Sequence, residues 1–289
     1  MMANIVKQLG LAGIGLLAAA SLGSAVAADL APAPAYKAPV TAVAPPATWN
    51  GFYVGGNVGY GWDSGSSTGI SLVSTDPILV PFVAAATTAG VFPAALSPSA
   101  SGAIGGGQAG YNWQMSQWLL GLEADIQASG IRGSAAQTTF PVGFDSTSTS
   151  VSKSIDWFGT VRGRLGFLPT SQLLLYATGG FAYGQTRTSF FTTDVPFGCI
   201  PAATICANGA SSSVRTGWTA GAGAEAMLGT NWSVKVEYLY VDLGSRSLSV
   251  PASTVPAIVF TTSTPFREQI VRAGLNYHFN WGGPVVARY

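Results

Sequence analysis

The sequence has few charged residues, a single histidine and only two cysteines, and each scarcity excludes a class of function. Charged residues make up 9% of the 289 residues, and 13 Lys and Arg nearly balance 12 Asp and Glu. This balance provides neither a net positive field nor a clustered basic face, so nucleic acid is not an expected partner. Because His278 is the only histidine, no Ser, His and acid set can be assembled, and the sequence predicts no enzyme.

Long apolar runs are also missing beyond the first 28 residues. Hydrophobic residues make up 48% of the chain, yet no later segment approaches the roughly 18 unbroken apolar residues of a membrane-spanning helix. The apolar residues must therefore be spread over alternating segments, which is the pattern of β-strands.

The two cysteines, Cys199 and Cys206, lie in a stretch that Pro196, Gly198 and Pro201 mark as a loop. In an oxidising compartment they are expected to form a disulfide. A zinc site is the poorer alternative, since two thiols without a nearby histidine do not complete a zinc shell. The loop aspartates are too sparse for a calcium site. The sequence thus predicts no metal and no cofactor.

The N-terminus carries the features of a secretory signal. Lys7 precedes an apolar run over 9–20, and small residues end at Ala25-Val26-Ala27-Ala28. We predict a signal peptide over 1–27, removed after Ala27 or Ala28. A retained membrane anchor is disfavoured because the apolar run is short.

Residues 28–48 are rich in Ala and Pro and are predicted to form a periplasmic arm. This composition favours extended polyproline conformation and cannot bury a core. A plain disordered spacer is the favoured interpretation, and binding to peptidoglycan is the alternative.

Eight segments of about ten residues alternate apolar and polar side chains. In Val271–Phe279, for example, every odd position is apolar and Arg, Gly, Asn and His lie between. The segments are 52–62, 103–115, 118–127, 155–167, 173–185, 214–228, 232–241 and 271–279. Tilted strands of this length cross a bilayer with one face toward lipid and one toward a polar interior. The sequence therefore predicts an all-β fold, an eight-stranded antiparallel transmembrane barrel over 49–281, with a C-terminal extension over 282–289.

The alternative is a soluble barrel or sandwich with its apolar faces turned inward. Nearly all the large aromatic residues would then have to fit inside, which exceeds the volume of an eight-stranded interior.

The connections between these segments alternate between short and long. The short ones are 116–117, 168–172 and 229–231, and the long ones are 63–102, 129–154, 186–213 and 243–265. This alternation predicts short periplasmic turns and long extracellular loops. Tryptophans mark both membrane boundaries: Trp113, Trp118 and Trp232 beside the short turns, and Trp62, Trp157 and Trp218 beside the long loops.

Ten charged residues are predicted to face the barrel interior, five of each sign. They are Glu123, Asp125, Asp156, Glu225, Glu237, Arg162, Arg164, Arg215, Lys235 and Arg272. The interior of an eight-stranded barrel is just wide enough for side chains, so we expect these charges to pair and fill it. The alternative is a charged constriction that selects solutes in a small channel.

The opening segment Trp49–Trp62, the segment 232–244 and the closing strand resemble the small outer-membrane immunogenic proteins of alpha-proteobacteria. These are RopB-like relatives of the OmpA and opacity-protein barrels. The resemblance covers nearly the whole mature chain. It implies an eight-stranded barrel of the bacterial cell outer membrane with variable surface loops and a structural role, in a family whose members are often described as porins without a defined substrate.

The end of the last strand, with Gly274, Tyr277 and Phe279, resembles the signal that the barrel-assembly machinery recognises. Because the chain continues past Phe279, the terminal Tyr289 is the alternative signal residue. Other expected partners are outer-membrane lipid and lipopolysaccharide, with a host surface as a further candidate. The apolar run Ile78–Val83 in the first long loop either contacts such a partner or folds back on other loops.

These observations predict an outer-membrane barrel with a structural or surface-interaction role. A small non-specific diffusion channel is the second hypothesis, and an outer-membrane enzyme is a distant third.

Overall fold

A computed structural model describes residues 48–200 and 204–279 of the chain. In these ranges the elements are β1 (Gly51–Asp63), β2 (Thr68–Ser74), η1 (Pro77–Leu79), α1 (Val80–Thr88), β3 (Ala95–Leu96), β4 (Ser101–Met115), β5 (Trp118–Thr139), β6 (Thr147–Thr170), β7 (Leu173–Asp194), β8 (Ala207–Leu228), β9 (Trp232–Pro251) and β10 (Ile258–His278). Neither helix in this part of the chain is long and apolar enough to span a membrane. The predicted signal peptide (1–27), nearly all of the Ala/Pro-rich arm (28–48), the extension (282–289) and Tyr289 lie outside the described residues.

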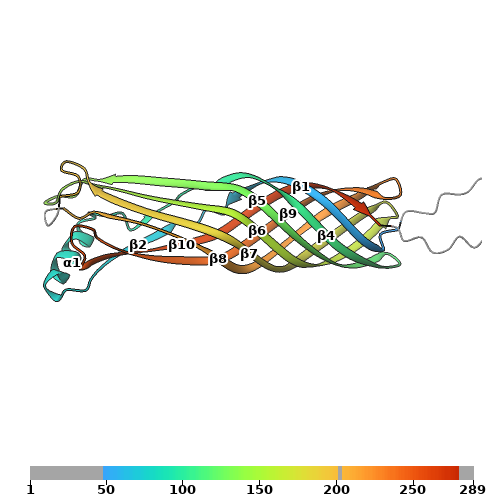
Figure 1. Cartoon of the computed structure of the whole chain (residues 1–289), viewed down its shortest axis with the longest axis horizontal. Helices are drawn as coiled ribbons and strands as arrows, with labels where there is room; N and C mark the ends of the chain where they lie inside the picture. The colour runs from blue at the N-terminus through green and yellow to red at the C-terminus, as the bar shows by residue number, and fades with distance from the viewer. Residues whose placement is uncertain (1–47, 201–203, 280–289) are drawn as a thin grey trace, which may run out of the picture. The chain divides into compact units, whose positions relative to one another are not determined.

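Eight long strands form a closed antiparallel ring. Strands β4 to β10 pair in chain order, and β1 pairs with both β4 and β10. Figure 1 shows the strands tilted around a common axis, as closure of a barrel requires. The predicted eight-stranded barrel is therefore confirmed. Strands β2 and β3 extend the sheet from β10 and stand outside the ring.

The short connections gather at one end of the barrel, together with both ends of the described barrel chain (Figure 1). Two of them use left-handed residues, Ser116 with φ 57° and Gly229 with φ 83°. Trp118 and Trp232 lie beside these turns with about half of their surface exposed. This end corresponds to the periplasmic side of a membrane barrel.

Six of the eight barrel strands, β5 to β10, are about one and a half to two times as long as predicted. Strands β5 to β10 contain between 20 and 24 residues. The prediction of 129–154, 186–213 and 243–265 as loops is therefore wrong for most of their length. These stretches are rich in Ser, Thr and Val, which suit a pleated surface, and they continue the pairing of the strands below them.

Two bulges invert the side-chain alternation part-way along the long strands. We call the part of the ring between these bulges and the short turns the lower barrel. In β6, Asp156 is an extra residue between the pairs Ile155↔Thr186 and Trp157↔Gln185. In β9, Leu243 and Gly244 oppose the single residue Phe266 of β10, and Gly244 has φ 75°. An extra residue in one strand sends every later side chain to the opposite face.

Above the bulges the ring separates into two facing sheets. The β8–β9 pairing ends at Trp218↔Asp242, and the β4–β5 pairing ends at Ser101↔Arg132. The upper parts of β5 to β8 form one sheet, and those of β9 and β10 form the other with β2 and β3. Apolar side chains fill the space between them: Val83, Leu96, Val151, Phe190, Ala207, Val250, Ala252, Ile258 and Phe260. We call this part the upper sandwich.

Candidate functional site

A buried network of charged side chains occupies the middle of the barrel interior. Eight of the ten residues predicted from the sequence meet there, and their side chains have 0% exposure. They are Glu123 and Asp125 of β5, Arg162 and Arg164 of β6, Glu225 of β8, Lys235 and Glu237 of β9, and Arg272 of β10. Four acidic groups thus face four cationic groups, so the network is balanced in formal charge.

Glu123 is the centre of this network. Its carboxylate accepts hydrogen bonds from Lys235 Nζ at 2.9 Å, from Tyr53 Oη at 2.7 Å and from Arg162 Nη2. Arg272 Nη2 lies 3.4 Å away. Tyr53 belongs to β1, so a single carboxylate connects side chains from strands on different sides of the barrel wall.

Two arginines link the remaining acids on this side. Arg162 donates to Asp125 Oδ2 and to Glu237 Oε1, both at 3.0 Å. Arg272 donates to Glu237 Oε2 at 2.7 Å and to Asp125 Oδ2 at 3.0 Å. Each guanidinium therefore bridges two carboxylates, which is the charge-assisted geometry that makes a buried pair strong.

Arg164 connects the network to its periplasmic side. It donates to Glu225 Oε2 at 2.6 Å and to Tyr53 Oη at 2.7 Å, and its guanidinium lies 4.0 Å from the centre of the Tyr176 ring. Glu225 Oε1 accepts from Ser233 Oγ at 2.5 Å and from Asn276 Nδ2 at 2.6 Å. Neutral groups thus satisfy the oxygen of Glu225 that Arg164 leaves free.

Apolar layers close the interior below and above this network. Below it, Trp49 is buried with Leu119, Leu168, Leu174, Tyr176 and Met227. Its indole Nε1 donates to Ser171 O at 3.0 Å, in the turn between β6 and β7. Above it lies a second cluster: Ala100, Ile104, Ile131, Ile155, Phe158, Ala182, Leu239, Val241, Leu243, Phe266 and Ile270. Sequence analysis assigned no such role to Trp49, because a residue before the first strand carries no alternation signal.

Asp156 and Arg215, the other two residues predicted for the lumen network, are not part of it. The β6 bulge turns Asp156 outward, where it lies 3.5 Å from the exposed Arg187, and turns Ile155 into the interior. Arg215 lies above the membrane-spanning segments, where its Nη2 donates to Ser245 O at 2.5 Å. Both predictions were wrong. For Asp156, the regular alternation was extended through a bulge, and for Arg215 it was extended beyond the membrane-spanning part of the strand.

A second, smaller ion cluster lies above the membrane-spanning segments. Lys153 Nζ is 2.8 Å from Asp63 Oδ1 and 3.8 Å from Glu268 Oε1, and all three side chains are buried. Neither oxygen of Glu268 has a hydrogen bond in the described ranges. Burial raises the pKa of Glu268 to about 8, and the positive charge of Lys153 only partly offsets that rise. The sequence did not reveal this cluster, because its members come from predicted loops and strand ends.

The other predicted residues fall at the two ends of the barrel. Cys199 and Cys206 form the predicted disulfide in the β7–β8 loop. Gly274 faces the interior beside Lys235, whereas Phe279 lies on the outer surface and its backbone N–H donates to Phe52 O at 2.8 Å. Tyr277 contacts Trp232 and Phe279 edge to face. The region described holds no group of three His, Cys, Asp or Glu side chains that could bind a metal ion.

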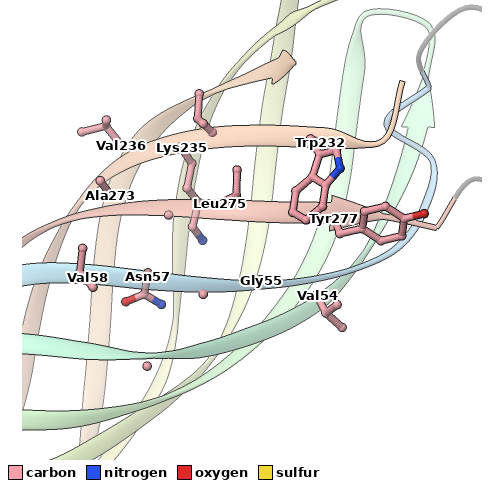
Figure 2. A pocket seen from close by; sticks show the side chains of 14 residues that line it. Val54, Gly55, Asn57, Val58, Trp232, Lys235, Val236, Ala273, Leu275 and Tyr277 are labelled. Carbon is pink, nitrogen blue, oxygen red and sulfur yellow. The ribbon is translucent and has the colours of Figure 1, made fainter. Parts of the chain in front are cut away.

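The outer wall carries a shallow apolar groove of about 840 Å³ across β9, β10 and β1, shown in Figure 2. Val54, Val58, Val236 and Leu275 line it, and Trp232 stands at one end. Because the side chain of Ala273 is small, it leaves a hollow between these larger side chains. The groove lies on the face that a membrane barrel turns toward lipid, and its lining supplies packing contacts but no chemistry.

Comparison with known proteins identifies the family. Residues 15–279 match the family described as outer membrane protein beta-barrel domain. The chain belongs to this family. It is 35% identical to the 31 kDa outer-membrane immunogenic protein of Brucella melitensis over 91% of this chain and 97% of that one. It is 27% identical to the 25 kDa outer-membrane immunogenic protein of Brucella abortus over 85% and 86% of the two chains.

Among solved structures, OprG of Pseudomonas aeruginosa covers 80% of this chain and 96% of its own, with a TM-score of 0.43 and 12% identity. Because the curated relatives are outer-membrane proteins of Gram-negative bacteria, this chain is an outer-membrane β-barrel protein.

Proposed function

We propose that this protein is a closed structural barrel that holds the upper sandwich outside the outer membrane as a platform for surface contacts. The observation that carries the proposal is the filled interior. Side chains from opposite walls touch at Glu123, and apolar layers lie below and above it. An eight-stranded barrel packed in this way leaves no continuous path for water.

A diffusion channel is the competing function. It requires a polar path along the whole axis, yet a solute would have to displace paired ions with no exposed surface and then cross the buried layer around Phe158 and Leu239. The geometry therefore favours a structural role over conduction.

The one Ser and His pair at hydrogen-bond distance within residues 48–200 and 204–279 does not have the geometry of a catalytic site. Ser233 Oγ lies 2.9 Å from His278 Nε2, but Glu225 Oε1 lies 3.6 Å from the same ring nitrogen and 2.5 Å from the serine. A catalytic triad instead places the acid on the other ring nitrogen, where it orients the base. All three groups are buried inside the barrel, so no substrate reaches them.

The partners that follow from this role are outer-membrane lipid and lipopolysaccharide at the wall and the barrel-assembly machinery during insertion. Exposed apolar residues of the lower barrel, among them Leu120, Ile126, Val161 and Leu275, supply the lipid-facing surface. The Ala/Pro-rich arm provides the candidate contact to peptidoglycan.

Planar-bilayer recording on the refolded mature protein tests the proposal. We expect no discrete current steps from protein that circular dichroism and gel mobility show to be folded. An Arg162→Glu, Arg164→Glu variant is the comparison, because a working pore would change its ion selectivity with this reversal. Ohmic steps from the wild type whose selectivity shifts in the variant would replace the closed barrel with a channel.

A further inference from the structure

The far end of the upper sandwich exposes an unusual number of apolar side chains. We call it the tip and define it by residues 77–92, 140–147, 194–200 and 204–206. Its exposed side chains include Val142 at 95%, Ile78 at 84%, Phe140 at 79% and Phe197 at 60% exposure. The others are Val80, Phe82, Val195 and Ile200. Apolar clusters of this kind on a water-facing surface mark interaction sites.

Contacts between the segments show that the tip is one surface. Val195 N donates to Ser146 O at 2.8 Å. The rings of Phe82 and Phe144 meet edge to face at 6.0 Å, and Thr147 Oγ1 donates to Val91 O. Figure 1 shows α1 beside the ends of the long strands, opposite the end where the described barrel chain begins and ends.

A pocket of about 410 Å³ opens among these segments. Phenylalanines 82, 92 and 144 contribute to its wall, as do Asp145 and Asp194. Asp194 is only 5% exposed, and its Oδ1 accepts from Phe197 N at 3.0 Å. A largely buried carboxylate in the wall of a pocket favours a positively charged donor inside that pocket.

The charged residues of the tip indicate which kind of group would bind in the pocket. Asp145 and Asp194 are the only charged residues in its defining segments, and no Lys or Arg is among them. A cationic group entering the pocket would meet a carboxylate and aromatic rings together, the combination that favours Lys or Arg side chains. The apolar rim would then bury the residues around that cation.

We propose that the tip is a docking site for a protein that presents a Lys or Arg side chain within an apolar surface. The inference rests on the proposed surface role and adds the chemistry of the partner. A lipid surface is the other class of partner that exposed apolar loops could contact. It fits less well, because membrane surfaces carry negative potential and would repel the two carboxylates.

Fluorescence anisotropy with the full-length protein in zwitterionic nanodiscs tests the proposal. The probes are labelled five-residue peptides with two leucines on each side of a central Arg, Gln or Glu. We expect the Arg peptide to bind best, and the Asp145→Asn, Asp194→Asn double variant to weaken its binding by about tenfold or more. Asp156→Asn, an outward carboxylate outside the tip, is the matched control and should leave binding unchanged.

Two further variants keep the test decisive if Asp194→Asn impairs folding. Asp145→Asn alone changes an exposed residue and should still reduce Arg-peptide binding. The Phe140→Ser, Val142→Ser variant should reduce the binding of all three peptides. Equal binding of the Arg and Glu peptides, or binding that ignores the aspartate variants, would overturn the proposal.

A vesicle-binding experiment tests the alternative that the tip binds a lipid surface. The nanodiscs are mixed with phosphatidylcholine and phosphatidylglycerol vesicles, and their flotation with the vesicles is measured. If they float with the vesicles, and the Phe140→Ser, Val142→Ser variant abolishes this, the tip binds lipid and the proposal of a protein partner is overturned. If no peptide binds while the bilayer recordings stay silent, the closed barrel stands and the tip proposal alone fails.

Discussion

The lower barrel and the upper sandwich are built from the same strands, but the lower barrel encloses charged side chains and the upper sandwich encloses apolar ones. In the lower part of β9, Val234 and Val236 are exposed, whereas Lys235 and Glu237 are buried. In its upper part, Ser247 and Ser249 are exposed and Val250 is buried. The surroundings explain the difference, because lipid favours apolar side chains outside and water favours them inside. The bulge at Gly244 lets one strand satisfy both.

The two halves should therefore respond differently to substitution, and the largest effect is expected in the lower network. Glu123→Ala removes the buried carboxylate that Lys235, Arg162 and Arg272 all contact. Removing one partner of such a set costs about 3–5 kcal/mol. Urea unfolding of the protein in lipid vesicles measures this loss. Arg187→Ala, in an exposed pair, is the control and should cost less than about 1 kcal/mol. If Glu123→Ala lowered the unfolding free energy no more than Arg187→Ala does, the buried network would contribute no more stability than an exposed ion pair.

Phe260→Ala should produce the next largest loss, confined to the upper sandwich. Phe260 is fully buried, with ring centres 5.0 Å from Phe92 and 5.2 Å from Phe190. A buried Phe→Ala change costs about 3 kcal/mol or more. Amide hydrogen exchange should show faster exchange in the upper parts of β9 and β10 and no change below Gly244. A uniform change along both strands would mean that the halves unfold together.

Removing the disulfide should destabilise only the β7–β8 loop. The bridge closes a short loop, since Cys199 and Cys206 are seven residues apart, and loop closure of that length contributes about 2.5 kcal/mol. A Cys199→Ser, Cys206→Ser variant should be cleaved faster by protease in that loop, as should the reduced wild type. Unchanged cleavage in both would show that hydrogen bonds such as Ile200 N to Thr204 Oγ1 already order the loop.

Glu268 should make the stability of the protein depend on pH. An unfolded glutamate has a pKa near 4.3, whereas burial raises the folded pKa of Glu268 to about 8. Between these values the folded state holds a proton that the unfolded state releases. Unfolding free energy should therefore fall as pH rises from about 4.5 to about 8, and then level off. The neighbouring charges are Lys153 and Asp63.

The Glu268→Gln variant isolates this contribution, because the side chain keeps its shape and no longer titrates. The difference in unfolding free energy between wild type and variant, measured at pH 5 and pH 8, should be smaller at pH 5. A difference independent of pH would show that Glu268 is ionised throughout this range.

Sequence alternation predicted the lower barrel well. The register that places Glu123 opposite Arg162 and Arg272 opposite Glu237 follows once eight strands of one tilt are paired in order. The disulfide was predictable as well, because only two cysteines share one short loop in an exported chain.

The upper half could not be predicted in the same way. Its strands alternate Ser and Thr with a few apolar residues, a pattern also typical of loops. The two bulges leave no mark in the sequence except Gly244, and the one at Asp156 misled the assignment of Ile155 and Asp156. Whether the tip segments meet depends on long-range pairing, such as that of Thr147 with Val91, which local periodicity does not encode.

Cysteine accessibility on β9 in intact cells tests the inversion between the two halves most directly. Val236→Cys and Ser249→Cys both place a thiol on the outer face of the same strand, below and above Gly244. A membrane-impermeant maleimide should label Ser249→Cys and leave Val236→Cys unmodified, because one position faces water and the other lipid. Labelling of both, or of Val236→Cys alone, would contradict the arrangement of a lipid-embedded barrel that continues into a water-exposed sandwich.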